Sequence, residues 1–135
     1  MSYYFSTVID ADFDEAIART RAALQEEGFG VVSEIDIQKT LRDKIGADFR
    51  RYTILGACNP VLAHEALRLE DKVGAMLPCN VVVQAKGEGS TEIAAIDPVA
   101  SMQAIDNPAL KDAAAEVRER LRAVIGQLEK SGVAA

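Results

Sequence analysis

Apolar residues first cluster in a short stretch at the start of the chain and then recur with the period of a helix. Residues 3–10 are rich in aromatic and β-branched side chains, which favour a strand. A helix is predicted to begin after Asp12, an N-cap to which Glu15 can reach back as the second half of a capping box. Gly28 supplies the left-handed residue that ends such a helix. The chain is therefore expected to open with a strand and a helix.

The same kind of pattern predicts four further strands and four further helices. Gly46 stops a short helix, and residues 87–89 have the length and the glycines of a hairpin connection. The last helix carries the longest apolar stripe in the chain. The strands are expected at residues 29–34, 49–58, 77–86 and 90–97, and the helices at residues 37–45, from 60, from 98 and at 108–130.

Three of the expected helices begin with the same device, an asparagine or aspartate followed by proline. The side chain of the first residue can accept a hydrogen bond from the first helical turn. Proline fits the next position because its missing N–H would have had no partner there. The pairs are Asn59-Pro60, Asp97-Pro98 and Asn107-Pro108, and each is fully explained as a helix start.

The order of the elements decides the fold class. It opens with alternating strands and helices, but the hairpin around residues 87–89 requires two antiparallel neighbours. We therefore predict an α+β fold with a single, mainly antiparallel sheet of about five strands and helices packed mainly on one face. No repeat, linker or low-complexity segment divides the sequence, so residues 1–135 are expected to form one domain around a single core.

The net charge of −6 bears on the choice of partner. Nucleic-acid binding depends on clustered Lys and Arg, and the densest basic run, at residues 118–122, alternates with glutamate on a predicted helix. We expect no nucleic-acid partner. The sequence shows neither a leader segment nor a membrane-spanning stretch, so we expect a cytoplasmic protein with reduced cysteines and no membrane partner.

The candidate chemistry lies in two similar short stretches, LGACNP and LPCN. They hold the only two cysteines of the chain, Cys58 and Cys79, which are followed by Asn59 and Asn80. If the third and fourth strands are antiparallel neighbours, the end of one and the start of the other lie at the same edge of the sheet, and the cysteines lie close together. If those strands are parallel, the cysteines lie at opposite ends.

Two interpretations of the cysteines stay open. Cys58 precedes a helix N-cap, where unpaired N–H groups lower a thiol pKa and favour the reactive thiolate. An unpaired cysteine is also among the most buried residue types and often serves only as a small apolar side chain. Strand alternation points Cys79 toward the core and Asn80 the other way, and asparagine is disfavoured inside strands. Asn80 is thus the residue that a purely structural role explains least well.

A metal site would need more ligands than the two cysteines. His64 is the only histidine, and it falls opposite the apolar stripe of its helix, so we expect it to face solvent. Cys58 and Cys79 alone suit a soft ion such as Cu(I), whereas the usual four-ligand zinc spacing is absent. No phosphate-binding, dinucleotide-binding, catalytic-triad or zinc-hydrolase motif occurs in the sequence. The residues therefore assign no cofactor and no reaction.

Four stretches taken in order resemble the DUF302 family of small bacterial and archaeal proteins of uncharacterised function: GFGVVSEID, RRYTILGACNP, MLPCNVVVQ and AAIDP. The resemblance runs from about Tyr3 to Leu128, and its specific part is the combination of ACNP, LPCN and their spacing. It implies a compact α+β fold and homodimerisation, without an established reaction, cofactor or catalytic residue. The family-motif positions are Cys58, Asn59, Pro60, Pro78, Cys79 and Asn80.

Three functional hypotheses follow from these features. The preferred one is a binding module whose site at the sheet edge takes a small molecule or a soft metal ion. In the second, Cys58 is a partly ionised nucleophile and Cys79 is its resolving partner in redox or sulfur-transfer chemistry. In the third, the protein is a non-catalytic dimeric interaction protein whose cysteines belong to the core. The residues of the preferred site are Cys58, Asn59, Cys79 and Asn80.

Overall fold

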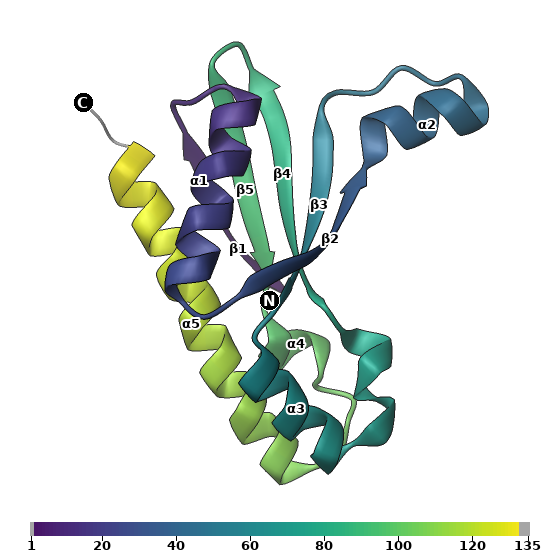
Figure 1. Cartoon of the computed structure of the whole chain (residues 1–135), viewed down its shortest axis with the longest axis vertical. Coiled ribbons are helices and arrows are strands. Elements are labelled where there is room, and N and C mark those ends of the chain that lie inside the picture. The colour runs from purple at the N-terminus through teal and green to yellow at the C-terminus, as the bar shows by residue number, and fades with distance from the viewer. Residues whose placement is uncertain (1, 133–135) are drawn as a thin grey trace.

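The computed structural model of the protein describes residues 2–132. Within this range the chain forms a five-stranded sheet, α-helices and one short 3-10 helix, η1 (Figure 1). The strands lie where the apolar pattern predicts them, with small shifts at their ends. The elements are β1 (Tyr4–Ile9), α1 (Phe13–Glu26), β2 (Gly30–Asp36), α2 (Ile37–Ile45), β3 (Tyr52–Cys58), α3 (Pro60–Leu69), η1 (Asp71–Met76), β4 (Cys79–Gly87), β5 (Ser90–Ile96), α4 (Pro98–Ser101) and α5 (Pro108–Gly132).

The sheet is antiparallel throughout, with the strand order β1-β5-β4-β3-β2. β4 and β5 form the hairpin predicted around residues 87–89. β3 and β4 are also neighbours, and their pairing runs from Tyr52 opposite Gln84 to Ala57 opposite Cys79. The predicted α+β class is confirmed, and the two cysteine-bearing strands have the antiparallel arrangement.

The helices α1 and α5 cover one face of the sheet. Both pack against the strands and against each other, and Figure 1 shows them side by side along this face. The strand side chains alternate accordingly, since Thr53, Leu55 and Ala57 of β3 are buried under the helices, whereas Tyr52 and Ile54 are more exposed. The prediction that helices pack mainly on one face is confirmed.

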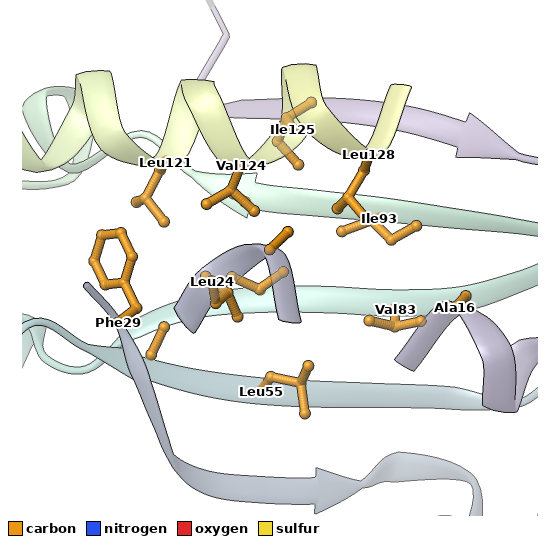
Figure 2. Packing of buried hydrophobic residues seen from close by; sticks show 14 of the residues in the cluster. Ala16, Leu24, Phe29, Leu55, Val83, Ile93, Leu121, Val124, Ile125 and Leu128 are labelled. Atoms are coloured by element: carbon orange, nitrogen blue, oxygen red, sulfur yellow. The ribbon is translucent and has the colours of Figure 1, made fainter. Parts of the chain in front are cut away.

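The main core lies between this face and the two helices (Figure 2). Leu121, Val124 and Leu128 of α5 extend toward Leu24 of α1 and toward the strands. Each of these four side chains has at most 1% of its surface exposed. Full burial of a side chain of this size stabilises the fold by about 1.5–3 kcal/mol. The C-terminal half of α5 is therefore firmly anchored to the sheet.

The three Asx-Pro pairs begin helices, as the sequence predicts. Asn59 Oδ1 accepts a hydrogen bond from the backbone N–H of Leu62 at 3.2 Å in α3. Asp97 and Asn107 accept in the same way from the first turns of α4 and α5, at 3.0 and 3.2 Å. Each proline follows directly and occupies the first helical position.

The first helix departs from prediction in one detail. Asp12 caps α1 by accepting from the Glu15 N–H at 2.9 Å, and Gly28, with a φ of 87°, supplies the left-handed residue after the helix. The reciprocal half of the expected capping box is wrong, because the Glu15 carboxylate accepts from Arg19 Nε instead. A cation one helical turn away has taken the place of the backbone donor.

Two other segments differ from expectation. η1 was not predicted, because its six residues are too short for a periodic apolar pattern and only Val73 among them is buried. α2 ends at Gly46 as predicted, yet none of its nine residues, all described, is buried, and Figure 1 shows it beyond the ends of β2 and β3. No helix described in residues 2–132 is long and apolar enough to span a membrane. Charged residues interrupt the apolar sequence even in α5.

Candidate functional site

The two cysteines lie on adjacent strands at one end of the sheet. Cys58 is the last residue of β3 and Cys79 is the first residue of β4. Because Ala57 pairs with Cys79, Cys58 falls opposite Pro78, one position along from Cys79. Both are free thiols. The two cysteines are not paired across the strands, because Cys79 pairs with Ala57. They nevertheless border one cavity, since the chain leaves the sheet at Cys58 to enter α3.

The two thiols have different surroundings. Cys79 is buried, with 6% of its surface exposed, whereas Cys58 is half-buried. Burial, with a smaller contribution from the charge of nearby Cys58, raises the pKa of the Cys79 thiol to about 11. At neutral pH Cys79 therefore carries its proton and is a small, weakly polar group.

A cavity of about 310 Å³ lies at this end of the sheet, and both thiols border it. The ends of β3 and β4 form one wall, α3 forms the second and α5 the third, with η1 and the α4 region closing the remaining side. Figure 1 shows α3, α4 and the first half of α5 grouped beyond the end of the sheet. The helical lining comprises Leu62, Ala63, Ala66 and Leu67 of α3 and Leu110, Ala113, Ala114 and Val117 of α5.

The lining is almost entirely hydrocarbon. Of the described residues, none that borders the cavity carries a charge. Asn59 is the one lining side chain with a strong hydrogen-bonding group, and its Oδ1 is already engaged by the N–H of Leu62. Sulfur atoms of Cys58, Cys79 and Met102 supply the remaining heteroatoms of the side chains. The site can accept an apolar group by shape and exclusion of water, and it offers little to a charged one.

The two asparagines of the paired motif lie in different places. Asn59 caps α3 and borders the cavity. Asn80 is exposed on the opposite face of the sheet, where it borders a second and more polar pocket, of about 320 Å³, together with Tyr52 and Gln84. This placement follows from strand alternation, because the preceding residue, Cys79, points to the covered face. The structure thus groups Cys58, Asn59 and Cys79 and sets Asn80 apart from them.

His64 is exposed on α3 and does not border the cavity, as the helical pattern predicts. The apolar stripe opposite it is the α3 wall of the cavity. The part of the chain that the structure describes holds no group of three or more His, Cys, Asp or Glu residues placed to bind a metal ion. Metal binding at this end of the sheet would rest on the two thiols.

The far wall of the cavity was missed by sequence reasoning. Met102 and Leu110 form a second, smaller cluster of buried residues with Val73 of η1, apart from the main core. In the sequence these residues are indistinguishable from ordinary core positions. A usable signal is the pair of alanines on the facing stripes of two helices, Ala66 on α3 and Ala114 on α5, because small side chains leave space between them.

Comparisons with known proteins agree on one family. Residues 5–128 match the family described as "Domain of unknown function DUF302". No curated protein matches the chain. A crystal structure of an uncharacterized conserved protein DUF302 from Bacillus stearothermophilus is 32% identical, with a TM-score of 0.86, and the match covers 95% of this chain and 99% of that one. The chain therefore belongs to the DUF302 family, as its sequence motifs predict.

Proposed function

We propose that this protein binds a small molecule in the cavity at the end of its sheet. The observation that carries the proposal is the cavity of about 310 Å³ whose wall includes Cys58, Asn59 and Cys79, three residues of the paired Cys-Asn motifs. Concave, mostly apolar spaces of this size are the usual small-molecule sites of proteins. In this function the motif shapes the site, and no turnover is required.

A small molecule suits this site better than a soft metal ion. Thiols bind metal ions as thiolates, and the pKa of the buried Cys79 thiol is raised to about 11. A metal ion would have to displace this proton in apolar surroundings, with only Cys58 as a second protein thiol. Binding of an uncharged molecule requires no such step.

The same property weakens the redox or sulfur-transfer alternative. A resolving thiol attacks a disulfide in its thiolate form. Burial raises the pKa of Cys79, the candidate resolving residue, from 9.0 to about 11, so its thiolate is about a hundredfold scarcer at neutral pH than that of an ordinary thiol. We therefore assign Cys58 and Cys79 to the wall of the site in the proposed function, and not to a reacting pair.

Nuclear magnetic resonance titration of the reduced protein tests this function. The probes are neutral, anionic and cationic molecules of about ten non-hydrogen atoms. At least one class is expected to shift the amide signals of the cavity wall saturably, and Ala114→Leu should weaken this binding by occupying part of the space. Ala115→Leu, which adds the same side chain at the exposed neighbouring position, is the matched control and should bind normally. Saturable shifts that occur only elsewhere, or no binding by any class, would contradict the proposal.

Self-association is a second candidate function, and the uncovered face of the sheet favours it. An apolar row crosses four strands on this face, formed by Ala94, Val82, Ile54 and Ile35. Ile35 is 45% exposed, and among the described elements α1 and α5 both lie on the other face. Apolar rows of this kind commonly pack against a second sheet. We propose a second copy of this chain as the occupant.

The polar residues beside the row are self-complementary. Gln84 of β4 lies between Arg50, which donates to its Oε1 at 2.8 Å, and Glu92 of β5, which accepts from its Nε2 at 2.9 Å. A two-fold axis along β4 would bring Glu92 of each copy toward Arg50 of the other. Five strands with a spacing of ~4.8 Å and a length of about 20 Å give a face of roughly 500 Å² per copy. This area is at the low end for a specific interface. A weak, reversible dimer is therefore expected.

Analytical ultracentrifugation over a range of concentrations tests self-association. Val82→Glu should be monomeric where the wild type is dimeric, whereas Val61→Glu, a change at a 78% exposed position on α3, should leave the dimer unchanged. Glu92→Arg and Arg50→Glu should each weaken the dimer, and the double variant should restore it. A wild-type monomer at all concentrations, or a dimer that survives Val82→Glu, would contradict this candidate.

A further inference from the structure

We infer that the ligand of the cavity is a neutral, carbon-rich molecule of about ten non-hydrogen atoms, such as a medium-length alkyl chain or a substituted aromatic ring. This inference rests on the proposed binding function and adds the chemical class of the ligand. Three properties of the site lead to it. They are an uncharged lining, a start of α3 with no free N–H group at the cavity, and the volume.

The lining offers no ionic partner to a charged ligand. Of the residues that the structure describes, those around the cavity include neither an acid nor a base. The guanidinium of Arg120 lies near Gly28, as the side chain of Asn59 does, but it already donates to the Glu27 carbonyl at 3.2 Å and to the Glu116 carboxylate at 3.1 Å. A charge moved from water into such a site loses its hydration without compensation.

The start of α3 is also poorly suited to an anion, although free N–H groups at a helix start often bind one. The N–H of Leu62 donates to Asn59 Oδ1 at 3.2 Å and the N–H of Ala63 donates to Asn59 O at 2.8 Å. Pro60 has no N–H. The remaining residue of the first turn, Val61, is 78% exposed and does not border the cavity. The positive end of this helix therefore does not turn the cavity into an anion site.

The sulfur atoms in the wall fit an apolar ligand. Cys79 is a neutral thiol at ordinary pH, and burial, which raises its pKa from 9.0 to about 11, keeps it mostly neutral even at pH 10. Met102 contributes a thioether and is 5% exposed. Such polarizable groups pack favourably against hydrocarbon and aromatic surfaces. They stabilise a carbon-rich ligand without requiring a hydrogen bond from it.

The volume and the rim set the size of the ligand and its approach. A volume of about 310 Å³ corresponds to about ten groups the size of a water molecule, at roughly 30 Å³ each. An apolar cavity of about half this volume is known to bind benzene in another protein. Val32 of β2 and Leu67 of α3 belong to the lining and are 65% and 44% exposed, so the cavity meets solvent at an apolar rim.

A matched pair of ligands, 1-octanol and octanoate, tests the class, because the two share a chain length and differ in charge. In nuclear magnetic resonance titrations at neutral pH, octanol should bind the cavity wall saturably and roughly tenfold or more tightly than octanoate. Octylamine provides the cationic member of the series and should bind as weakly as octanoate. Ala114→Leu and Ala66→Leu should each weaken octanol binding by occupying part of the cavity, whereas Ala115→Leu should leave it unchanged.

The outcomes separate this inference from the function on which it rests. If octanoate or octylamine binds the cavity wall as tightly as octanol, the ligand class is wrong and the small-molecule function stands. If none of the three binds there and only charged probes of similar size do, the class is again wrong. If no probe of any charge binds there, the proposed function itself fails. Circular dichroism of each variant establishes that lost binding is not lost folding.

Discussion

The two halves of α5 carry one continuous apolar stripe but lie in different surroundings. In the C-terminal half, Leu121 and Val124 pack against α1 and the sheet in a filled core (Figure 2). In the N-terminal half, Leu110 and Ala114 are 1% and 3% exposed, nearly as buried, yet they border a cavity. Burial of a side chain and close packing around it are therefore separate properties. The two halves of α5 are buried alike and differ in packing.

The end of the sheet explains this difference. Beneath the C-terminal half of α5, the strands contribute Leu55, Val83 and Ile93 to the space between helices and sheet. Beneath the N-terminal half, the neighbouring strands reach only their terminal residues, Cys58 and Cys79. Strand side chains no longer fill the interior there, and the space between α3 and α5 stays open.

Removal of a large side chain should show the largest difference in stability between the filled core and the cavity region. Leu121→Ala is expected to lower the free energy of unfolding by about 2–5 kcal/mol, because it creates a void in a filled core. Leu62→Ala, at a half-buried position that already borders the cavity, should cost about 1 kcal/mol. Urea unfolding followed by circular dichroism measures both. Equal losses would mean that the two regions are packed alike.

The opposite kind of substitution, from a small to a large side chain, should distinguish the same two regions. Ala16→Leu inserts a larger side chain into the filled core and should destabilise the protein by about 1–3 kcal/mol. Ala114→Leu extends into the cavity and should change stability by less than about 1 kcal/mol in either direction. Thermal and urea unfolding of the two variants provide the measurement. A loss at Ala114 as large as that at Ala16 would show that the cavity cannot accommodate the side chain.

The pH dependence of the free energy of unfolding tests whether water reaches Cys79 at the cavity. The pKa of Cys79 is raised from 9.0 to about 11, so above pH 9 the unfolded chain loses a proton that the folded chain keeps. The unfolded state then binds fewer protons, and stability falls as pH rises, by about 1.4 kcal/mol at pH 10. Urea unfolding at pH 8 and pH 10 should show this loss in the wild type relative to Cys79→Ala. A loss near zero would indicate that water reaches the thiol.

The smallest expected effect concerns helix caps, which should be insensitive to the difference between the two regions. Asp12→Ala removes the cap of α1 beside the filled core, and Asn59→Ala removes the cap of α3 beside the cavity. Each should cost about 1 kcal/mol, because the lost hydrogen bond is local. Chemical unfolding compares the two variants. A much larger loss at Asn59 would show that its side chain also supports the cavity wall.

Local patterns made most of the fold predictable. Capping by Asp12 and by the Asx-Pro pairs, the left-handed Gly28 and the hairpin at residues 87–89 each depend on residues a few positions apart. The pairing of β3 with β4 joins Ala57 to Cys79, residues far apart in the sequence. From the sequence, a parallel and an antiparallel arrangement of these strands were both open. Pairing of distant strands depends on the whole sheet, which no local pattern encodes.

The sequence indicated where the candidate site lies but did not predict that a cavity is present there. Of the four residues that the paired motifs indicated, Cys58, Asn59 and Cys79 border the cavity. Asn80 lies on the opposite face of the sheet, as strand alternation predicted. The cavity itself arises where two strand ends, α3 and α5 meet, so its volume depends on distances between distant segments. Alanines such as Ala66 show that space is available, but only the assembled helices determine its extent.

The Asn-Pro helix starts also affect how the protein ages. Asparagine deamidates when the backbone nitrogen of the following residue gives up its hydrogen and attacks the side-chain amide. Asn59 and Asn107 are two of the three asparagines in the chain, and both precede proline, whose nitrogen has no hydrogen to give up. The third, Asn80, precedes β-branched Val81, which is held between β3 and β5 in the middle of the ladder. The residues that begin α3 and α5 thus also protect the chain from slow chemical damage.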